Sequence, residues 1–249
     1  MHKFFVDAGS INDQTICITG VDVKHLSGVL RLRKGELIQV CDGNGNEYIC
    51  SINEIEKKQV ICHIEESFKS NTEPPLTITL YQGLPKAQKM DLIVQKCTEI
   101  GVCRIVPVIT SRVVVKSEEK DIGNKLERWR RIAEEAAKQS NRGRIPEIGS
   151  LIDFKTALQQ AEELDMAIIP YEQEKAVGLR KALAPRNRVM TAGIFIGPEG
   201  GFEEEEVKEA ASKGITPITL GPRILRTETA GFISAACILY EIGDIGGSI

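Results

Sequence analysis

Short segments in which hydrophobic and polar residues alternate fill the first 70 positions of the chain. Residues 36–40, 47–52 and 59–64 each show the two-residue period of a half-buried strand. The turn-forming run DGNGN at residues 42–46 predicts a hairpin between the first two strands. Apolar residues at helical spacing predict a short helix within residues 21–35. Several short strands joined by regular turns predict a small β-barrel-like domain.

A polar stretch with two prolines, residues 67–75, follows this region. We place a first domain at residues 1–70, a linker at 71–75 and a second domain at 76–249. In the second domain apolar strands alternate with amphipathic helices, which predicts an α/β fold with a mostly parallel sheet flanked by helices. The predicted strands are residues 76–82, 104–109, 166–170, 193–197 and 216–220. The predicted helices are residues 86–100, ended by Gly101, and 124–141, 203–212 and 229–242.

The composition favours a globular protein of the reducing cytoplasm. Hydrophobic residues make up 42% of the 249 positions, enough for a buried core. The chain has no long apolar run and its first ten residues do not resemble a signal peptide, so we expect no membrane association. The seven cysteines show no CxxC spacing and histidines number three, so we expect free thiols and no metal site. Cys50 and Cys62 are expected at buried strand positions.

The distribution of charge leaves two interpretations open. The whole chain has a net charge of −3, but residues 84–144 carry 14 Lys and Arg against eight Asp and Glu. A local excess of positive charge is typical of a surface that faces phosphates. Ordinary solvated helix faces explain the excess equally well.

A glycine-rich segment, IFIGPEGGF at residues 194–202, connects a predicted strand to a helix. Ligands bind at the carboxyl ends of strands in open α/β sheets, and glycines let main-chain groups approach them closely. The four glutamates at residues 203–206 would repel a phosphate from this helix end. A cationic ligand such as a sulfonium therefore fits better, and a plain tight turn is the alternative.

A second segment, LGPRILRTETA at residues 220–230, also runs from a strand end into an apolar helix. Thr227 or Thr229 is a candidate cap for that helix, with Glu228 near its positive end. Arg226 adds positive charge to the same loop.

Together these two segments resemble the signature of the SPOUT-class methyltransferases and, more closely, that of the RsmE family. Residues 23–35 are similar to the N-terminal stretch of that family, and Lys3 stands where the family often has arginine. Further residues that match the family are Lys86, Lys89, Asp91, Lys96, Glu99, Gly101, Gln139, Arg142 and Pro146. The resemblance spans nearly the whole chain.

The resemblance implies an enzyme that uses S-adenosyl-L-methionine to methylate N3 of a uridine in 16S ribosomal RNA of the small subunit. It also implies a deep trefoil knot in the second domain, a PUA-like RNA-binding first domain and a homodimer. The cofactor-binding residues implied by the matched loops are Pro170, Ile196, Gly197, Gly200, Gly201, Leu220, Gly221, Ile224, Leu225, Thr229 and Ala230. The candidate RNA contacts are Lys3, His25, Arg31, Lys86, Lys89, Lys96, Gln139, Arg142 and Arg144.

Methylation of uridine N3 requires loss of its proton, which leaves negative charge on the base. We expect Arg226 to stabilise that charge, as a cation does in an oxyanion site. Glu199 and Glu228 are candidates to accept the proton or orient the base. Helix capping or an ion pair with Arg226 is the simpler role for both glutamates, and a solvated helix face is the simpler role for the candidate RNA-binding lysines.

Two other functions stay open at the level of sequence. One is a SPOUT-type enzyme that acts on another RNA position, such as a ribose hydroxyl of transfer RNA. The other is a catalytically inactive RNA-binding assembly factor, against which the intact segments 197–201 and 220–230 argue. An enzyme that acts on nucleotide phosphates is disfavoured by the glutamates that follow Gly201.

Overall fold

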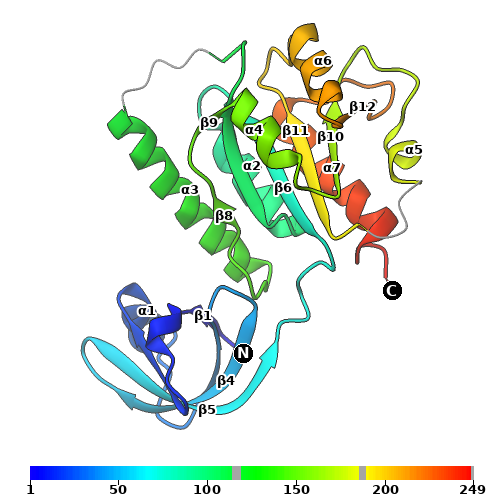
Figure 1. The fold of residues 1–249 in the computed structure, drawn as a ribbon. Helices are drawn as coiled ribbons and strands as arrows, with labels where there is room; N and C mark the ends of the chain where they lie inside the picture. Colours follow the sequence, from blue (N-terminus) through cyan, green and yellow to red (C-terminus); the bar gives the residue numbers. More distant parts are fainter. Residues whose placement is uncertain (114–118, 185–188, 248–249) are drawn as a thin grey trace. The chain divides into compact units, whose positions relative to one another are not determined.

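The computed structural model describes residues 1–113, 119–184 and 189–247, and the chain folds into two compact units (Figure 1). The N-terminal unit comprises Met1–Glu73 and Ala137–Ile145, and the C-terminal unit comprises Pro74–Ala136 and Pro146–Ile249. A short segment from the middle of the chain thus belongs to the N-terminal unit. Nothing in the residue pattern indicates this assignment.

A five-stranded sheet forms the N-terminal unit, with the strand order β1-β3-β4-β5-β2. β1 pairs with β3 in parallel, and the other pairs are antiparallel. The expected hairpin joins β3 and β4, and the Asp42 carboxylate accepts hydrogen bonds from the N–H groups of Asn44 and Asn46 at 2.8 and 3.0 Å. The elements are β1 Lys3–Phe5, a 3-10 turn Ala8–Ser10, β2 Thr15–Thr19, β3 Leu37–Cys41, β4 Asn46–Ile55 and β5 Gln59–Lys69.

The short helix expected after β2 is present as α1, Val21–Lys24, which continues into a π-helical turn, His25–Val29. Val23 and Leu26 are buried there and pack into the core of the sheet. β5 continues through Lys69, so the first three residues of the polar stretch 67–75 belong to this strand. The side chains of these three strand residues are exposed, including that of Phe68.

Two buried basic side chains, each in an ion pair, connect residues 137–145 with the rest of the N-terminal unit. Nζ of Lys3 lies 3.2 Å from Glu47 and donates a hydrogen bond to the carbonyl oxygen of Asn141 at 3.0 Å. Arg142 pairs with Glu73 at 2.6 Å, and Glu73 also accepts hydrogen bonds from the next two main-chain N–H groups, both at 3.1 Å. The expectation that Lys3 and Arg142 contact RNA is therefore corrected, because buried and paired side chains do not reach a phosphate.

The C-terminal unit is built on a sheet with the order β12-β10-β11-β6-β7-β8, and β9 also pairs with β7. All these pairings between described strands are parallel, which confirms the expected α/β class. The strands are β6 Thr77–Gly83, β7 Arg104–Ile109, β8 Glu147–Ile148, β9 Ile152–Asp153, β10 Met166–Pro170, β11 Thr191–Ile196 and β12 Thr216–Ile218. The helices are α2 Lys89–Ile100, α3 Glu119–Gln139, α4 Phe154–Ala161, α5 Leu179–Leu183, α6 Glu204–Ser212 and α7 Thr227–Ile242, and the last three residues of α3 belong to the N-terminal unit.

Helices cover both faces of this sheet, with α4 and α6 on one face and α2 and α7 on the other (Figure 1). On the first face the ring of Tyr81 stacks on that of Phe195, with centroids 4.5 Å apart, and Phe154 of α4 packs edge-on against Phe195. On the second face a Cβ atom at Gly231 of α7 would lie 3.4 Å from the Leu80 side chain of β6. The start of α7 is thus held closely against the middle of the sheet.

The helix ends show where local contacts override helical spacing. α2 begins at Lys89 and not at residue 86, because Ala87 has a φ of 55°, in the left-handed region. It ends as expected at Gly101, with a φ of 111°. The acidic start of α6 is a capping box in which Glu203 and Glu206 each accept a hydrogen bond from the other's main-chain N–H.

All seven cysteines are free thiols, and Cys50 and Cys62 are buried in strands as expected. Burial raises the pKa of Cys41, Cys50, Cys62 and Cys97 to about 12, so these thiols stay protonated.

In the ranges that the structure describes, no group of three or more His, Cys, Asp or Glu side chains is arranged to hold a metal ion. No helix among the described residues combines the length and apolarity that crossing a bilayer requires.

Replacement of Arg142 by methionine should destabilise the N-terminal unit, because it leaves the Glu73 carboxylate without its ion-pair partner. We expect the free energy of unfolding to fall by about 3 kcal/mol, which is the lower end of the range for breaking a buried ion pair. The lower end applies because 17% of the Glu73 side chain is exposed to water. Urea denaturation followed by circular dichroism measures the loss. Arg144→Met is the matched control, because that side chain is exposed, and it should change stability by less than about 0.5 kcal/mol. Equal stability of the two variants would contradict the role of the pair.

Candidate functional site

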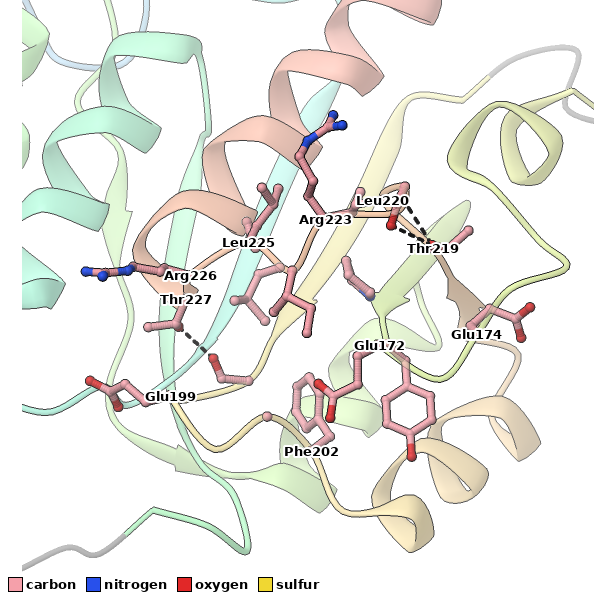
Figure 2. A pocket seen from close by; sticks show the side chains of 18 of the residues that line it. Glu172, Glu174, Glu199, Phe202, Thr219, Leu220, Arg223, Leu225, Arg226 and Thr227 are labelled. Carbon is pink, nitrogen blue, oxygen red and sulfur yellow. Dashed lines mark hydrogen bonds between the residues drawn. The ribbon is translucent and has the colours of Figure 1, made fainter.

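A cavity of about 840 Å³ lies at the carboxyl edge of the C-terminal sheet, where β10, β11 and β12 end (Figure 2). Its walls come from three loops, residues 170–175, 196–202 and 219–230, the last of which runs into α7. Lys89, the first residue of α2, also belongs to the wall. Parallel strands bring their carboxyl ends to one edge, which is where α/β sheets bind ligands. The two segments that the sequence analysis singled out therefore face one cavity.

Most of the residues expected to bind a cofactor line this cavity, and the exceptions are Gly200 and Thr229. A Cβ atom at Gly200 would lie 3.1 Å from Cδ of Arg112, which is not part of the wall. The expected residues found in the wall are Pro170, Ile196, Gly197, Gly201, Leu220, Gly221, Ile224, Leu225 and Ala230.

The wall also holds residues outside the set of individually expected cofactor contacts. Their position directly after a parallel strand, or beside a glycine-bearing turn, is the signal that points to them. They are Tyr171, Glu172, Glu174, Lys175, Pro198, Phe202, Thr219, Pro222 and Arg223.

The hydroxyl group of Thr227 ties two of the loops together. It donates a hydrogen bond to the carbonyl oxygen of Gly197 at 2.6 Å and accepts one from Nε2 of Gln82 at 2.9 Å. Gln82 is fully buried near the end of β6. The expected capping role of Thr227 is wrong, because Arg226 occupies the N-cap position of α7 and makes no capping bond through its side chain. Thr227 instead fixes the start of α7 against the end of β11.

Close contact between main-chain atoms shapes the loop after β11. A Cβ atom at Gly197 would lie 2.9 Å from the carbonyl carbon of Gly201, which itself has a φ of 70°. Arg112 supports this loop by donating a hydrogen bond to the carbonyl oxygen of Gly200 and by pairing with Glu203 at 2.7 Å. Hydrogen bonding between the two side chains raises the pKa of Arg112 and lowers that of Glu203. Without Cβ atoms at Gly197 and Gly201, main-chain groups of this loop are open to a ligand.

Lys89, Glu199 and Glu228 form a charged cluster in the wall. Nζ of Lys89 lies 3.0 Å from Glu199 and 3.5 Å from Glu228. Hydrogen bonding to Glu199 raises the pKa of Lys89. Although burial opposes the change, main-chain N–H groups and the Lys89 ammonium lower the pKa of Glu199. Both groups are therefore charged at neutral pH, and Lys89 lies at the cavity and not on an outer face of α2.

Arg226 and Glu228 differ in how far they are exposed. NH1 of Arg226 lies 3.8 Å from Glu228, but the Arg226 side chain is 83% exposed and extends away from the middle of the cavity (Figure 2). The Glu228 side chain is 14% exposed, and its Oε2 has no hydrogen-bond partner. Glu228 is thus an ion-pair partner of Lys89 more than of Arg226.

Glu172 and Glu174 lie across the cavity from Glu199 and Arg226 (Figure 2). The Glu174 carboxylate accepts hydrogen bonds from the N–H groups of residues 176 and 177 at 2.6 and 3.0 Å, which lower its pKa. Burial raises the pKa of Tyr171 beside them. Carboxylates on both sides suit a ligand that carries positive charge, and the apolar side chains of the wall provide a surface for a flat ring.

The remaining candidate RNA contacts are at the surface of one unit or the other. Those of the N-terminal unit are exposed, namely His25, Arg31, Gln139 and Arg144. In the C-terminal unit Lys86 is exposed, and Lys96 is half-buried and pairs with Glu99 at 2.7 Å.

Replacement of Thr227 by valine should loosen the cavity, because it removes both hydrogen bonds without changing the size of the side chain. We expect a loss of about 1–3 kcal/mol in the free energy of unfolding, as for a buried group left unpaired. We also expect weaker binding of S-adenosyl-L-methionine, the cofactor that the sequence implies. Chemical denaturation and titration calorimetry measure the two effects. Thr227→Ser keeps the hydroxyl group and should retain most of both properties; a serine variant as impaired as the valine variant would argue against the hydrogen bonds.

Two family models match the chain and together cover both units. Residues 72–239 match the model of an RNA methyltransferase domain, and residues 18–65 match that of an RNA methyltransferase PUA domain. The PUA match agrees with the small sheet of the N-terminal unit and confirms that part of the expected fold.

Three proteins of the same name are similar to this chain. The ribosomal RNA small subunit methyltransferase E of Bacillus subtilis is 36% identical over 248 residues, which is 97% of each chain. The protein of that name from Aquifex aeolicus is 34% identical over 97% of this chain and 100% of its own. The crystal structure of the ribosomal RNA small subunit methyltransferase E from Neisseria gonorrhoeae bound to S-adenosyl methionine superposes with a TM-score of 0.86 at 30% identity, covering 98% of this chain and 99% of that one. The chain therefore belongs to the ribosomal RNA small subunit methyltransferase E family of RNA methyltransferases.

Proposed function

We propose that this protein uses S-adenosyl-L-methionine to methylate N3 of a uridine in 16S ribosomal RNA of the small subunit. The observation that carries the proposal is the single cavity into which both glycine-bearing loops open. The names of its relatives and the bound S-adenosyl methionine of the Neisseria gonorrhoeae protein support the reaction class and the cofactor. The choice of uridine N3 rests on the RsmE resemblance of the sequence.

The residues of the cavity fit this cofactor. A volume of about 840 Å³ lies within the range of small-molecule sites. S-adenosyl-L-methionine supplies a methyl group on a positively charged sulfur, which suits a wall that contains carboxylates and no phosphate loop. We assign the adenine to main-chain groups of Leu220, Gly221, Leu225 and Ala230, and the ribose and methionine portions to Ile196, Gly197 and Gly201. Pro170 and Ile224 complete the wall, whereas Gly200 and Thr229 act only by shaping the loops.

We propose Glu199 and Glu228 as the catalytic groups and Arg226 as a group that contacts the RNA substrate. We assign to one of these carboxylates the role of accepting the N3 proton or of orienting the base, which the position of both in the wall supports. The exposure of Arg226 favours contact with the incoming RNA at the mouth of the cavity, in place of the anion-stabilising role expected from the sequence. Alignment of N3 with the methyl carbon contributes up to about 7–11 kcal/mol to lowering the barrier.

The N-terminal unit is the proposed RNA-binding part. We assign RNA binding to residues 1–70, a linker to 71–75 and methyl transfer to 76–249, with residues 137–145 added to the RNA-binding unit. Each phosphate contact steepens the salt dependence of RNA binding, so the slope measured for charge-neutralised variants tests the proposed contacts. These contacts are His25, Arg31, Lys86, Lys96, Gln139 and Arg144. The free thiols and the ribosomal substrate favour a cytoplasmic location.

The purified protein should transfer a methyl group from S-adenosyl-L-methionine to small subunits isolated from a strain that lacks this methyltransferase. Nuclease digestion and mass spectrometry should find 3-methyluridine in their 16S RNA. Gly197→Ala should abolish cofactor binding, because its Cβ would lie 2.9 Å from main-chain carbon of Gly201. Gly123→Ala is the matched control, since its Cβ would meet no atom within 4 Å.

Other outcomes of this experiment identify the competing functions. A methylated ribose, or methylation of transfer RNA alone, would indicate a SPOUT-type enzyme with another target. Absence of cofactor binding by the unchanged protein would indicate an inactive assembly factor.

We also propose that the protein is a homodimer, with α7 in the contact. Tyr240 of α7 is 64% exposed, Cys237 of the same helix is exposed, and Leu92 of the neighbouring α2 is 43% exposed. A second copy would remove these side chains from water, and α7 also lines the cavity through its first residues. Tyr240→Glu should convert dimers to monomers in sedimentation velocity, whereas Val21→Glu, at an exposed position of the N-terminal unit, should not. A monomeric unchanged protein would refute the proposal.

A further inference from the structure

Lys89 has surroundings unlike those of the other cations in the cavity wall. Its side chain is 34% exposed, whereas the other basic residues of the wall, Lys175, Arg223 and Arg226, are exposed. It is the first residue of α2, which places its Cα atom at a fixed point beside the cavity. A cation that is partly withdrawn from water interacts more strongly with a charge that develops beside it.

The groups that face Lys89 come from two other elements. Glu199, in the loop after β11, lies 3.0 Å from its Nζ, and Glu228 of α7 lies 3.5 Å away. Arg226, the N-cap residue of α7, approaches the far oxygen of Glu228 at 3.8 Å. Glu199 receives a second hydrogen bond, from the main-chain N–H of Lys86 at 3.1 Å, and is thereby held in place.

Glu228 is the less constrained of the two carboxylates. Its Oε2, the oxygen nearest Lys89, is buried and has no hydrogen-bond partner. A carboxylate oxygen that accepts no hydrogen bond keeps its lone pairs open to the N–H group of a base that enters the cavity. Glu199, with hydrogen bonds from two groups, holds its charge and keeps Lys89 at the wall.

We propose that Glu228 and Lys89 act as a pair in the methylation of uridine, an inference that rests on the proposed function. Glu228 accepts the N3 proton, so that the N3–H bond breaks and an O–H bond forms. Lys89, released from Glu228 but still held by Glu199, then stabilises the negative charge left on the uracil ring. N3 forms its bond to the methyl carbon as the carbon–sulfur bond breaks, with the electron pair of that bond remaining on sulfur. The proton carries one positive charge from base to carboxylate, so the total charge in the cavity does not change.

This division of roles differs from that expected from the sequence in one respect. In this proposal Lys89 is the cation next to the base and not a contact of RNA phosphates, and Arg226 stays at the mouth of the cavity. The cluster supplies both a proton acceptor and a cation within one salt-bridged group. A base that enters beside Glu228 therefore meets both.

Single-turnover methylation of unmethylated small subunits between pH 6 and pH 10 tests the proposal. Lys89→Met should slow the reaction about 10²–10³-fold at pH 7, the range for loss of one anion-stabilising group. The deficit should shrink as pH rises, because the base then loses its proton to water. Lys89→Arg should keep the rate within about tenfold, since it keeps a cation at the site. Glu228→Gln should slow the reaction at pH 7 and also recover at high pH.

Lys208→Met is the matched control for the loss of a paired lysine. Lys208 pairs with Glu204 at 2.6 Å, and hydrogen bonding to Glu204 raises its pKa as Glu199 raises that of Lys89. It is exposed on α6 and does not belong to the cavity wall. Its loss should leave the rate and the pH profile unchanged.

A second readout does not depend on activity. Calorimetric affinity for S-adenosylhomocysteine, measured well below the melting temperature of each protein, should be nearly the same for Lys89→Met, Lys89→Arg and the unchanged protein. A loss of cofactor affinity equal to the loss of rate would overturn the proposal, because Lys89 would then hold the cofactor. A deficit of Lys89→Met that is constant across the pH range, or no deficit at all, would overturn it as well. If the unchanged protein makes no 3-methyluridine, the proposed function itself fails; if it does, these results bear on Lys89 and Glu228 alone.

Discussion

The hydrogen bond from Thr227 to the carbonyl oxygen of Gly197 is the contact on which the cavity depends. A parallel sheet brings the ends of its strands to one edge, but it does not decide how the loops beyond those ends face one another. The two loops have glycines where they border the cavity, so side-chain packing cannot hold them there. The buried hydroxyl group of Thr227, which also accepts a hydrogen bond from the amide of Gln82, sets the distance between the two loops. Any other spacing of the loops would leave these buried polar groups without hydrogen bonds and would cost free energy. The hydrogen bonds therefore favour this one arrangement of the loops.

The charges of the site are arranged around this fixed frame. Arg112 supports the loop after β11 through the Gly200 carbonyl oxygen and Glu203. At the cavity, Lys89 is shared between two carboxylates from different elements. Paired charges in a partly buried wall avoid the full cost of desolvation while remaining available to a charged ligand. The same wall thus accommodates a positively charged cofactor and a base that becomes negative during the proposed reaction.

Periodicity and turn residues predict much of the fold from the sequence. Alternation of apolar and polar residues predicts the β3–β4 hairpin, and apolar runs predict the parallel sheet. A glycine in the left-handed region predicts the end of α2 at Gly101. All three signals are local properties of the sequence. The predictions fail where one backbone conformation or one distant contact departs from the periodic pattern. The left-handed φ of Ala87 moves the start of α2 to Lys89. Arg142 resembles a surface cation in the sequence, but it is buried and paired with Glu73. Sequence spacing contains no information about either.

The sequence alone identifies the two segments that border the cavity, because glycines and prolines between a buried strand and a helix mark close approach to a ligand. It did not determine which side chains of those segments point into the cavity. Three features are visible in the tertiary structure alone. Lys89 lies in the cavity wall, Gly200 contacts Arg112, and Thr227 donates its hydrogen bond to Gly197. The direction of these side chains depends on how α2, α7 and β11 pack against one another. Such packing brings together residues that are far apart in the chain, so sequence patterns do not predict it.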